Sequence, residues 1–260
     1  ILNNLEKAKS QYGLNIPVTE HPVIRSEEAC FLSSAKAVEL AGRNNSKLHI
    51  LHLSTAKEIS LFTSGPVSAK NITAEVCIHH LWFDETDYLT KGNFIKWNPS
   101  VKTKKDKEAL WEALLADKID TIATDHAPHT AEEKNKPYLE APSGGPLIQH
   151  SLVAMLEMSR RKIIPVEKVI QKMCHAPADL FKIDRRGYIR EGYYADLVLI
   201  DPNLSWEVMP ENILYKCGWS PFEGFEFTHK VISTFINGEE VFKMGKINNE
   251  IKGRKIKFNR

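Results

Sequence analysis

The stretch 121-TIATDHAPHTAEEK-134 decides the fold that we expect for this chain. A short apolar run, Ile122 and Ala123 between threonines, passes at once into Asp125, His126 and, after Ala-Pro, His129. Short apolar runs of this kind are typical of buried strands. A carboxylate and two imidazoles at the end of such a strand mark a candidate functional site.

Strand-like and helix-like segments alternate on both sides of this stretch. Ser26 followed by two glutamates predicts a capped helix, and Thr103 with Asp106 predicts another. The expected strands are 47–54, 72–80 and 120–124, and the expected helices lie near 2–11, 26–42, 55–63, 103–115 and 148–156. Alternation of this kind predicts βαβ units and a parallel sheet.

Polar residues gather directly after each expected strand, as in a (β/α) barrel, whose site lies at the carboxyl ends of its strands. We therefore predict an α/β fold in which residues 1–183 belong to a (β/α)8 TIM-type barrel. The segments 187–203 and 230–247 have strand patterning, and Asn237-Gly238 is a hairpin signal. Residues 184–260 are predicted to form a small β-sandwich domain.

The composition is that of a globular protein without a membrane or nucleic-acid partner. Of 260 residues, 42% are hydrophobic and 26% charged, with a net charge of +2, and no apolar run approaches the ~20 residues of a membrane span. Four scattered cysteines without a CxxC pair are interpreted as reduced thiols of a cytoplasmic protein. Homo-oligomer formation is left open.

Histidine and aspartate at strand ends predict a metal centre, in which His52 is a ligand and Asp125 is ligand, base or both. Imidazole and carboxylate are the usual ligands of catalytic zinc, which makes its bound water acidic enough to supply hydroxide. The alternative is structural, since a lone histidine at a strand end is more often hydrogen-bonded and Asp125 could cap a turn. His79 and His80 are expected on opposite faces of a strand.

Two further segments have both a structural and a functional interpretation. Asn98 could be a turn residue before Pro99, or an amide that donates to and accepts from a ring carrying C=O and N–H. Gly144-Gly145 could provide flexibility, or let the backbone approach a flat ligand closely.

The chain resembles the dihydroorotases, a group of the amidohydrolase superfamily, and their Bacteroidetes members in particular. The resemblance to the family rests on HILHLSTA (49–56), ITAEVCIHHLWF (72–83), KWNPSVKTKKDKEAL (96–110), IDTIATDHAPH (119–129) and GYYADLVLID (192–201). The likeness to the Bacteroidetes members rests on HPVIRSEEAC (21–30) and CGWSPFEGF (217–225). It implies zinc-dependent, reversible hydrolysis of dihydroorotate to N-carbamoyl-aspartate in pyrimidine synthesis, with Zn2+ as cofactor, binuclear in the complete enzyme.

The resemblance also implies residue roles. His52 resembles a zinc ligand, and Asp125 a zinc ligand and the general acid/base. The remaining positions resemble substrate-binding residues, His129 facing the substrate carboxylate: Asn98, His129, Pro142, Ser143 and Gly144. His80 and His126 are expected to have packing or supporting roles.

One departure from the dihydroorotase pattern is large. The family's paired His-x-His, its bridging lysine or aspartate and a further histidine belong to earlier barrel strands, and no such motif occurs in this sequence. We therefore expect a C-terminal fragment that alone binds zinc weakly and has little activity. The alternatives are a hydantoinase or allantoinase type of cyclic amidohydrolase, and a non-catalytic dihydroorotase-like partner protein.

Overall fold

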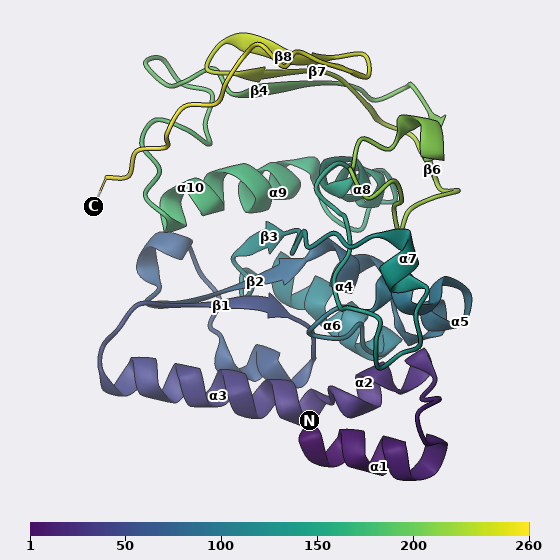
Figure 1. Cartoon of the computed structure of the whole chain (residues 1–260). Coiled ribbons are helices and arrows are strands. Elements are labelled where there is room, and N and C mark those ends of the chain that lie inside the picture. The colour runs from purple at the N-terminus through teal and green to yellow at the C-terminus, as the bar shows by residue number, and fades with distance from the viewer. Residues whose placement is uncertain (260) are drawn as a thin grey trace. The chain divides into compact units, whose positions relative to one another are not determined.

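Three short strands pair in parallel in the order β1 (Leu48–Leu53), β2 (Ile72–Cys77) and β3 (Thr121–Ala123). They belong to a computed structural model that describes residues 1–259 (Figure 1). Chain contacts divide it into two compact units, Ile1–Gln149 with Leu214–Pro221, and His150–Ile213 with the chain from Phe222 onward. The boundary predicted after residue 183 stays a prediction.

The helices of the first unit begin where the sequence supplies caps. Ser26 accepts a hydrogen bond from the amide of Ala29 at the start of α3 (Glu27–Arg43), and Thr103 forms a capping box with Asp106 at the start of α6 (Lys104–Leu115). Both predicted helix starts are confirmed. The other helices of this unit are α1 (Leu2–Tyr12), α2 (His21–Ile24), α4 (Ile78–Trp82), α5 (Tyr88–Lys91) and α7 (Ala131–Lys134).

Two predicted elements differ in the structure. The strand expected over 72–80 ends at Cys77, and Ile78 to Trp82 form α4, so the placement of His79 and His80 on opposite strand faces is wrong. The helix turn buries both rings, whereas a continued strand would direct them to opposite sides. The segment expected as a helix near 55–63 is a single 3-10 turn, Lys57–Leu61.

A buried ion pair holds the amino-terminal edge of the parallel sheet. Lys70, just before β2, donates to Asp120, just before β3, at 2.7 Å, and both side chains are nearly inaccessible. The second carboxylate oxygen of Asp120 accepts from the amide of Ala74 within β2 at 2.9 Å. One carboxylate therefore joins two strands where β3 begins.

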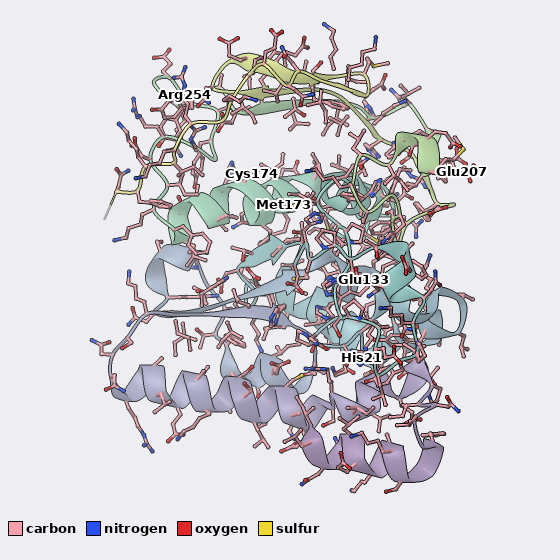
Figure 2. The ribbon with its side chains drawn as sticks, in the orientation of Figure 1. His21, Glu133, Met173, Cys174, Glu207 and Arg254 are labelled. Carbon is pink, nitrogen blue, oxygen red and sulfur yellow. The ribbon has the colours of Figure 1, made fainter. Side chains whose placement is uncertain are left out.

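The second unit combines helices with antiparallel sheets. Its helices are α8 (Ser151–Arg160), α9 (Val166–Ile170) and α10 (Ala176–Leu180), the last two joined by a π-helical turn, Gln171–His175, that includes Met173 and Cys174 (Figure 2). Its main sheet has the order β4 (Leu197–Asp201), β7 (Lys230–Ile236), β8 (Glu239–Lys243) and β9 (Lys246–Ile247), and a second pairs β5 (Trp206–Glu207) with β6 (Glu226–Phe227).

The hairpin predicted at Asn237-Gly238 joins β7 to β8. Both residues have positive φ, 54° and 87°, as a tight hairpin turn between twisted strands requires. Among the described residues 1–259, no helix combines the length and the apolar character needed to cross a membrane.

Loss of the carboxylate that joins β2 to β3 should destabilise the chain strongly. We expect Asp120→Ala to lower the free energy of unfolding by about 3–5 kcal/mol, because the Lys70 ammonium would stay buried without its partner. Urea unfolding measures this. Glu108→Ala, which removes an exposed ion pair with Lys104, is the control and should cost less than about 1 kcal/mol. Equal effects would contradict the role given to Asp120.

Buried histidines should make folding sensitive to mild acid. His21, whose ring nitrogens contact the Tyr138 hydroxyl at 2.9 Å and the Trp97 carbonyl at 2.6 Å, lies inside the first unit (Figure 2). Burial lowers its pKa to about 3, against a hydrogen bond to Trp97 that raises it. The unfolded chain accepts a proton near pH 6.5, so stability is full above that pH and is lost as the pH falls toward 3.

Between pH 7 and pH 5, His21 alone should remove about 2 kcal/mol of stability. Urea unfolding at both pH values measures the loss. His21→Gln should show a smaller loss than the parent chain, whereas the half-buried control His175→Gln should match the parent. An unchanged loss in His21→Gln would rule out this source of acid sensitivity.

Candidate active site

The strand ends of the parallel sheet carry the two predicted metal ligands on unusual backbone. His52, near the end of β1, has φ 40°, and Asp125, two residues past β3, has φ 47°. Residues other than glycine rarely adopt a positive φ, and where they do, the surrounding structure stabilises that conformation. Several turn residues, among them Asn45, Asp117 and Asn237, share positive φ, so the roles of His52 and Asp125 as metal ligands stay a prediction.

A buried carboxylate fixes the turn that follows His52. Glu58, 4% exposed, accepts hydrogen bonds from the Ser34 hydroxyl at 2.6 Å, the Thr55 hydroxyl at 2.8 Å and the Ser54 amide at 3.4 Å. The next amide, of Ala56, donates to Asp106 at 2.8 Å. The segment after β1 is thereby held to α3 and α6.

Asp125 lies within electrostatic range of two side chains from the neighbouring strands. Burial raises its pKa, the nearby His52 lowers it, and the carboxylate of Glu75 raises it further. Parallel pairing brings these strand ends together, although 73 residues separate His52 from Asp125. A raised pKa makes a carboxyl group a better proton acceptor than a fully solvated one.

Two further residues at this edge were not predicted. Glu75 and Cys77 lie two residues apart on one face of β2, and both carboxylates, Glu75 and Asp125, act on the buried Cys77 thiol, whose pKa burial raises well above its usual value. Glu75 also pairs with His49 at 3.2 Å. The period-two pattern of β2 placed Glu75 and Cys77 on one face, but did not indicate a site.

His79 and His80 are buried beside His52. Burial lowers the pKa of His79 well below 6.5 and that of His80 to about 3, and His52 lowers both further. The ring of His79 stacks on Trp97, with centroids 4.3 Å apart and planes 13° apart. These two histidines therefore flank the strand-end site from α4.

The strand ends supply two of the three protein ligands that a catalytic zinc requires. The imidazole of His52 and the carboxylate of Asp125 are ordinary zinc ligands and lie within electrostatic range of each other. A catalytic zinc takes three protein ligands, and this pair supplies two of them. The group of three donors close enough to share an ion within residues 1–259 is a different one, Cys77, His79 and His80.

Asn98 and His129 lie on segments outside the strands. Asn98 is exposed and precedes Pro99 through a cis peptide bond. Nδ1 of His129 lies 3.8 Å from the carboxylate of Glu133 on α7, which Figure 2 labels. The backbone carbonyl of His129 accepts a hydrogen bond from the Trp219 indole at 2.7 Å. Their substrate contacts stay a prediction.

Two buried lysines hold the loop over residues 138–145, which contains the predicted substrate-binding residues Pro142, Ser143 and Gly144. The Lys134 ammonium, 1% exposed, donates to the carbonyls of Gly144 at 2.7 Å, Pro142 at 3.0 Å and Lys96 at 3.3 Å. The Lys96 ammonium donates to the carbonyls of Tyr138 and Ala141 at 2.6 and 2.5 Å. Burial lowers the pKa of Lys134 to about 7 and that of Lys96 to about 8. The loop is therefore held by ammonium groups on backbone carbonyls.

The two glycines of this loop fit tightly against the protein itself. A Cβ on Gly144, at φ 125°, would lie 2.5 Å from the Ala127 carbonyl oxygen, and one on Gly145 would lie 2.8 Å from the Trp97 ring. The Gly144 amide donates to the Lys96 carbonyl at 2.8 Å. A ligand contact at Gly144 would therefore use the second lone pair of its carbonyl oxygen. The contacts predicted for Pro142 and Ser143 stay a prediction too.

His126 has a supporting position. Its Nδ1 accepts hydrogen bonds from the amides of Leu147 at 3.0 Å and Ile148 at 3.4 Å, and its ring packs against Tyr215. Because Nδ1 accepts, the neutral ring carries its proton on Nε2. His126 thus connects the segment after β3 to the chain that follows the glycine loop.

Comparison with known proteins defines the class to which this site belongs. The model of the amidohydrolase family matches residues 26–241, and the chain belongs to that family. The fold is the TIM-barrel type of α/β fold shared by its hydantoinase and dihydropyrimidinase structures, accompanied here by small sheets. The predicted fold class is confirmed.

The similar curated proteins are dihydroorotases. The chain is 36% identical to the dihydroorotase of Halobacterium salinarum over 77% of this chain and 46% of that protein. It is 31% identical to the dihydroorotase of Pyrococcus abyssi over 95% of this chain and 56% of that protein. The predicted resemblance is confirmed, and the chain spans about half the length of the curated relatives that it matches.

The similar solved structures include hydantoinases and a dihydropyrimidinase. D-Hydantoinase from Bacillus sp. AR9 is 25% identical with a TM-score of 0.84, over 95% of this chain and 56% of that one. Dihydropyrimidinase from Brevibacillus agri NCHU1002, 22% identical with a TM-score of 0.82 over 94% of this chain and 56% of that one, shows the fold alone.

Removal of the Lys134 ammonium should loosen the loop over residues 138–145. In Lys134→Met, the carbonyls of Pro142 and Gly144 lose their side-chain donor, each at a cost of about 1–3 kcal/mol, whereas the Lys96 carbonyl keeps the Gly144 amide. We expect a lower free energy of unfolding and faster amide exchange over residues 138–145, measured by hydrogen–deuterium exchange. The control is Lys136→Met, an exposed lysine two residues away. Equal exchange in both variants would contradict the role of Lys134.

Proposed function

We propose that this chain carries part of the active site of a dihydroorotase, with His52 and Asp125 at the ends of the parallel strands. The reaction is the reversible hydrolysis of the cyclic amide of dihydroorotate to N-carbamoyl-aspartate, in pyrimidine synthesis in the cytoplasm. The observation that supports the proposal most is the placement of His52 and Asp125 together at the carboxyl edge of the parallel sheet, in a chain similar to dihydroorotases. The chain spans about half the length of these relatives, and the proposal assigns roles to the residues of this chain alone.

The residues of this chain divide the work of the reaction. His52 and Asp125 would hold Zn2+, which when bound polarises the ring carbonyl and makes a water acidic enough to act at neutral pH. Asp125 accepts the proton of the attacking water and delivers it to the ring nitrogen as the C–N bond breaks. Its burial beside Glu75 favours proton uptake, while His52 favours the charged form.

Substrate choice depends on the segments after β2 and β3. Dihydroorotate carries a carboxylate that hydantoin and allantoin lack, and His129 is the residue proposed to face it. Asn98 donates to and accepts from the ring amide. In the free chain the His129 ring lies beside Glu133, so an incoming carboxylate competes with that side chain.

A second candidate is hydrolysis of hydantoins or dihydropyrimidines, because the similar solved structures are hydantoinases and a dihydropyrimidinase. The same strand-end residues would serve, and the two candidates differ in the group that His129 meets. A non-catalytic partner protein is the third. The presence of Asp125, Asn98 and His129 favours an enzyme, since a scaffold needs none of them.

The test is ring opening with added Zn2+ by the chain alone and by a chimera that adds the first five barrel strands of the Endomicrobium trichonymphae dihydroorotase, which is 35% identical. We expect dihydroorotate turnover by the chimera and little by the chain alone. Turnover of hydantoin or dihydrouracil in its place would select the second candidate. If the chimera folds, binds zinc and turns over none of these substrates, the result would favour the third candidate, a non-catalytic partner protein.

Neutralisation of the proposed acid/base should abolish most of the activity. In the active chimera we expect Asp125→Asn to lower kcat by about 10²–10⁴-fold, the usual contribution of a positioned proton-transfer group. Glu108→Gln, an exposed carboxylate on α6, is the control and should leave kcat unchanged. A kcat within threefold or so of the parent in Asp125→Asn would exclude the role given to Asp125.

A further inference from the structure

Three potential metal donors converge at the junction of β2 and α4. Cys77 ends the strand, and His79 and His80 lie in the first turn of the helix that follows. One ligand atom from each lies within 4.8 Å of the other two. All three side chains are fully buried, at 0%, 0% and 2% exposed.

The histidines of this cluster leave polar atoms without partners. Both ring nitrogens of His79 and Nδ1 of His80 are buried without a hydrogen bond among residues 1–259. His80 Nε2 lies 3.2 Å from the Pro99 carbonyl. Because a carbonyl only accepts, Nε2 of the neutral ring carries the proton and Nδ1 keeps its lone pair. Unsatisfied buried polar atoms are rare and point to an unseen partner.

We propose that Cys77, His79 and His80 form a binding site for a transition-metal cation of intermediate softness, with Zn2+ as the expected ion. This site is separate from the His52–Asp125 pair. Thiolate sulfur and imidazole nitrogen are the donors that select zinc and its neighbours, whereas magnesium and calcium take oxygen ligands. As the metal–sulfur bond forms, the thiol proton passes to solvent. Three protein donors leave one position of a tetrahedral ion for a fourth ligand.

The position of this site gives it a structural role. An ion held by Cys77 and the two histidines would fix α4 to the end of β2, and the His79 ring is already held flat against Trp97. Trp97 in turn contacts Gly145 of the substrate loop. The ion would thus stabilise the surroundings of the strand ends. The inference does not depend on the proposed reaction.

Cobalt(II) titration of the reduced full chain tests the site, because a thiolate ligand gives cobalt a charge-transfer absorption that imidazole and carboxylate do not. We expect this band in the parent chain and its loss in Cys77→Ser. The matched control is Cys30→Ser, a half-buried free cysteine on α3, which should keep the band. A parent chain that is folded and shows no band, or a band that survives Cys77→Ser, overturns the proposal.

Two further measurements separate this site from the proposed catalytic pair. The double variant His52→Ala with Asp125→Asn should retain the thiolate band, and loss of the band there would mean that one shared site exists, against the proposal. X-ray absorption of the zinc-loaded parent needs no substitution and should show a sulfur neighbour at about 2.3 Å. A zinc environment of nitrogen and oxygen alone also overturns the proposal.

Discussion

Parallel pairing of β1, β2 and β3 is the constraint on which the rest of the first unit depends. Because the strands run in one direction, their carboxyl ends meet at one edge, and His52, Cys77 and Asp125 lie together there. The opposite edge is held by the buried pair of Lys70 and Asp120. The sheet thus separates the groups that maintain it from those that can react, as barrel enzymes do.

Much of this arrangement was predictable because it depends on local signals. Ser26 and the Thr103–Asp106 pair start helices by satisfying free amides, and Asn237-Gly238 closes a hairpin through positive φ. These effects act within a few residues. The position of Asp125 past a strand followed from the break in the apolar run.

The features that escaped prediction depend on contacts distant in sequence. The β-branched pattern of 72–80 continues past Cys77, yet His79 and His80 lie on α4, where the ring of His79 stacks on the distant Trp97. Lysines are rarely buried without a carboxylate, so nothing local marks Lys96 and Lys134 as the supports of the loop. Their acceptors are carbonyls, which every residue carries.

The strand-end edge has an electrostatic character that its sequence does not show. Desolvation moves four groups there toward their neutral forms, raising the pKa of Asp125 and Cys77 and lowering that of His79 and His80. Neutral imidazoles keep the lone pairs that cations need, whereas the acids must release protons to bind one. Cation binding and proton release are therefore coupled at this edge.

The buried amine of Lys134 offers a way to measure how often the loop over residues 138–145 opens. Amine-directed acylating reagents need an accessible, unprotonated amine, and Lys134 is 1% exposed in the closed loop. Modification can proceed only when the loop opens and releases the amine from its three carbonyl acceptors. The rate at which Lys134 is acylated, followed by peptide mass spectrometry beside exposed Lys136, therefore measures how often the loop opens in solution.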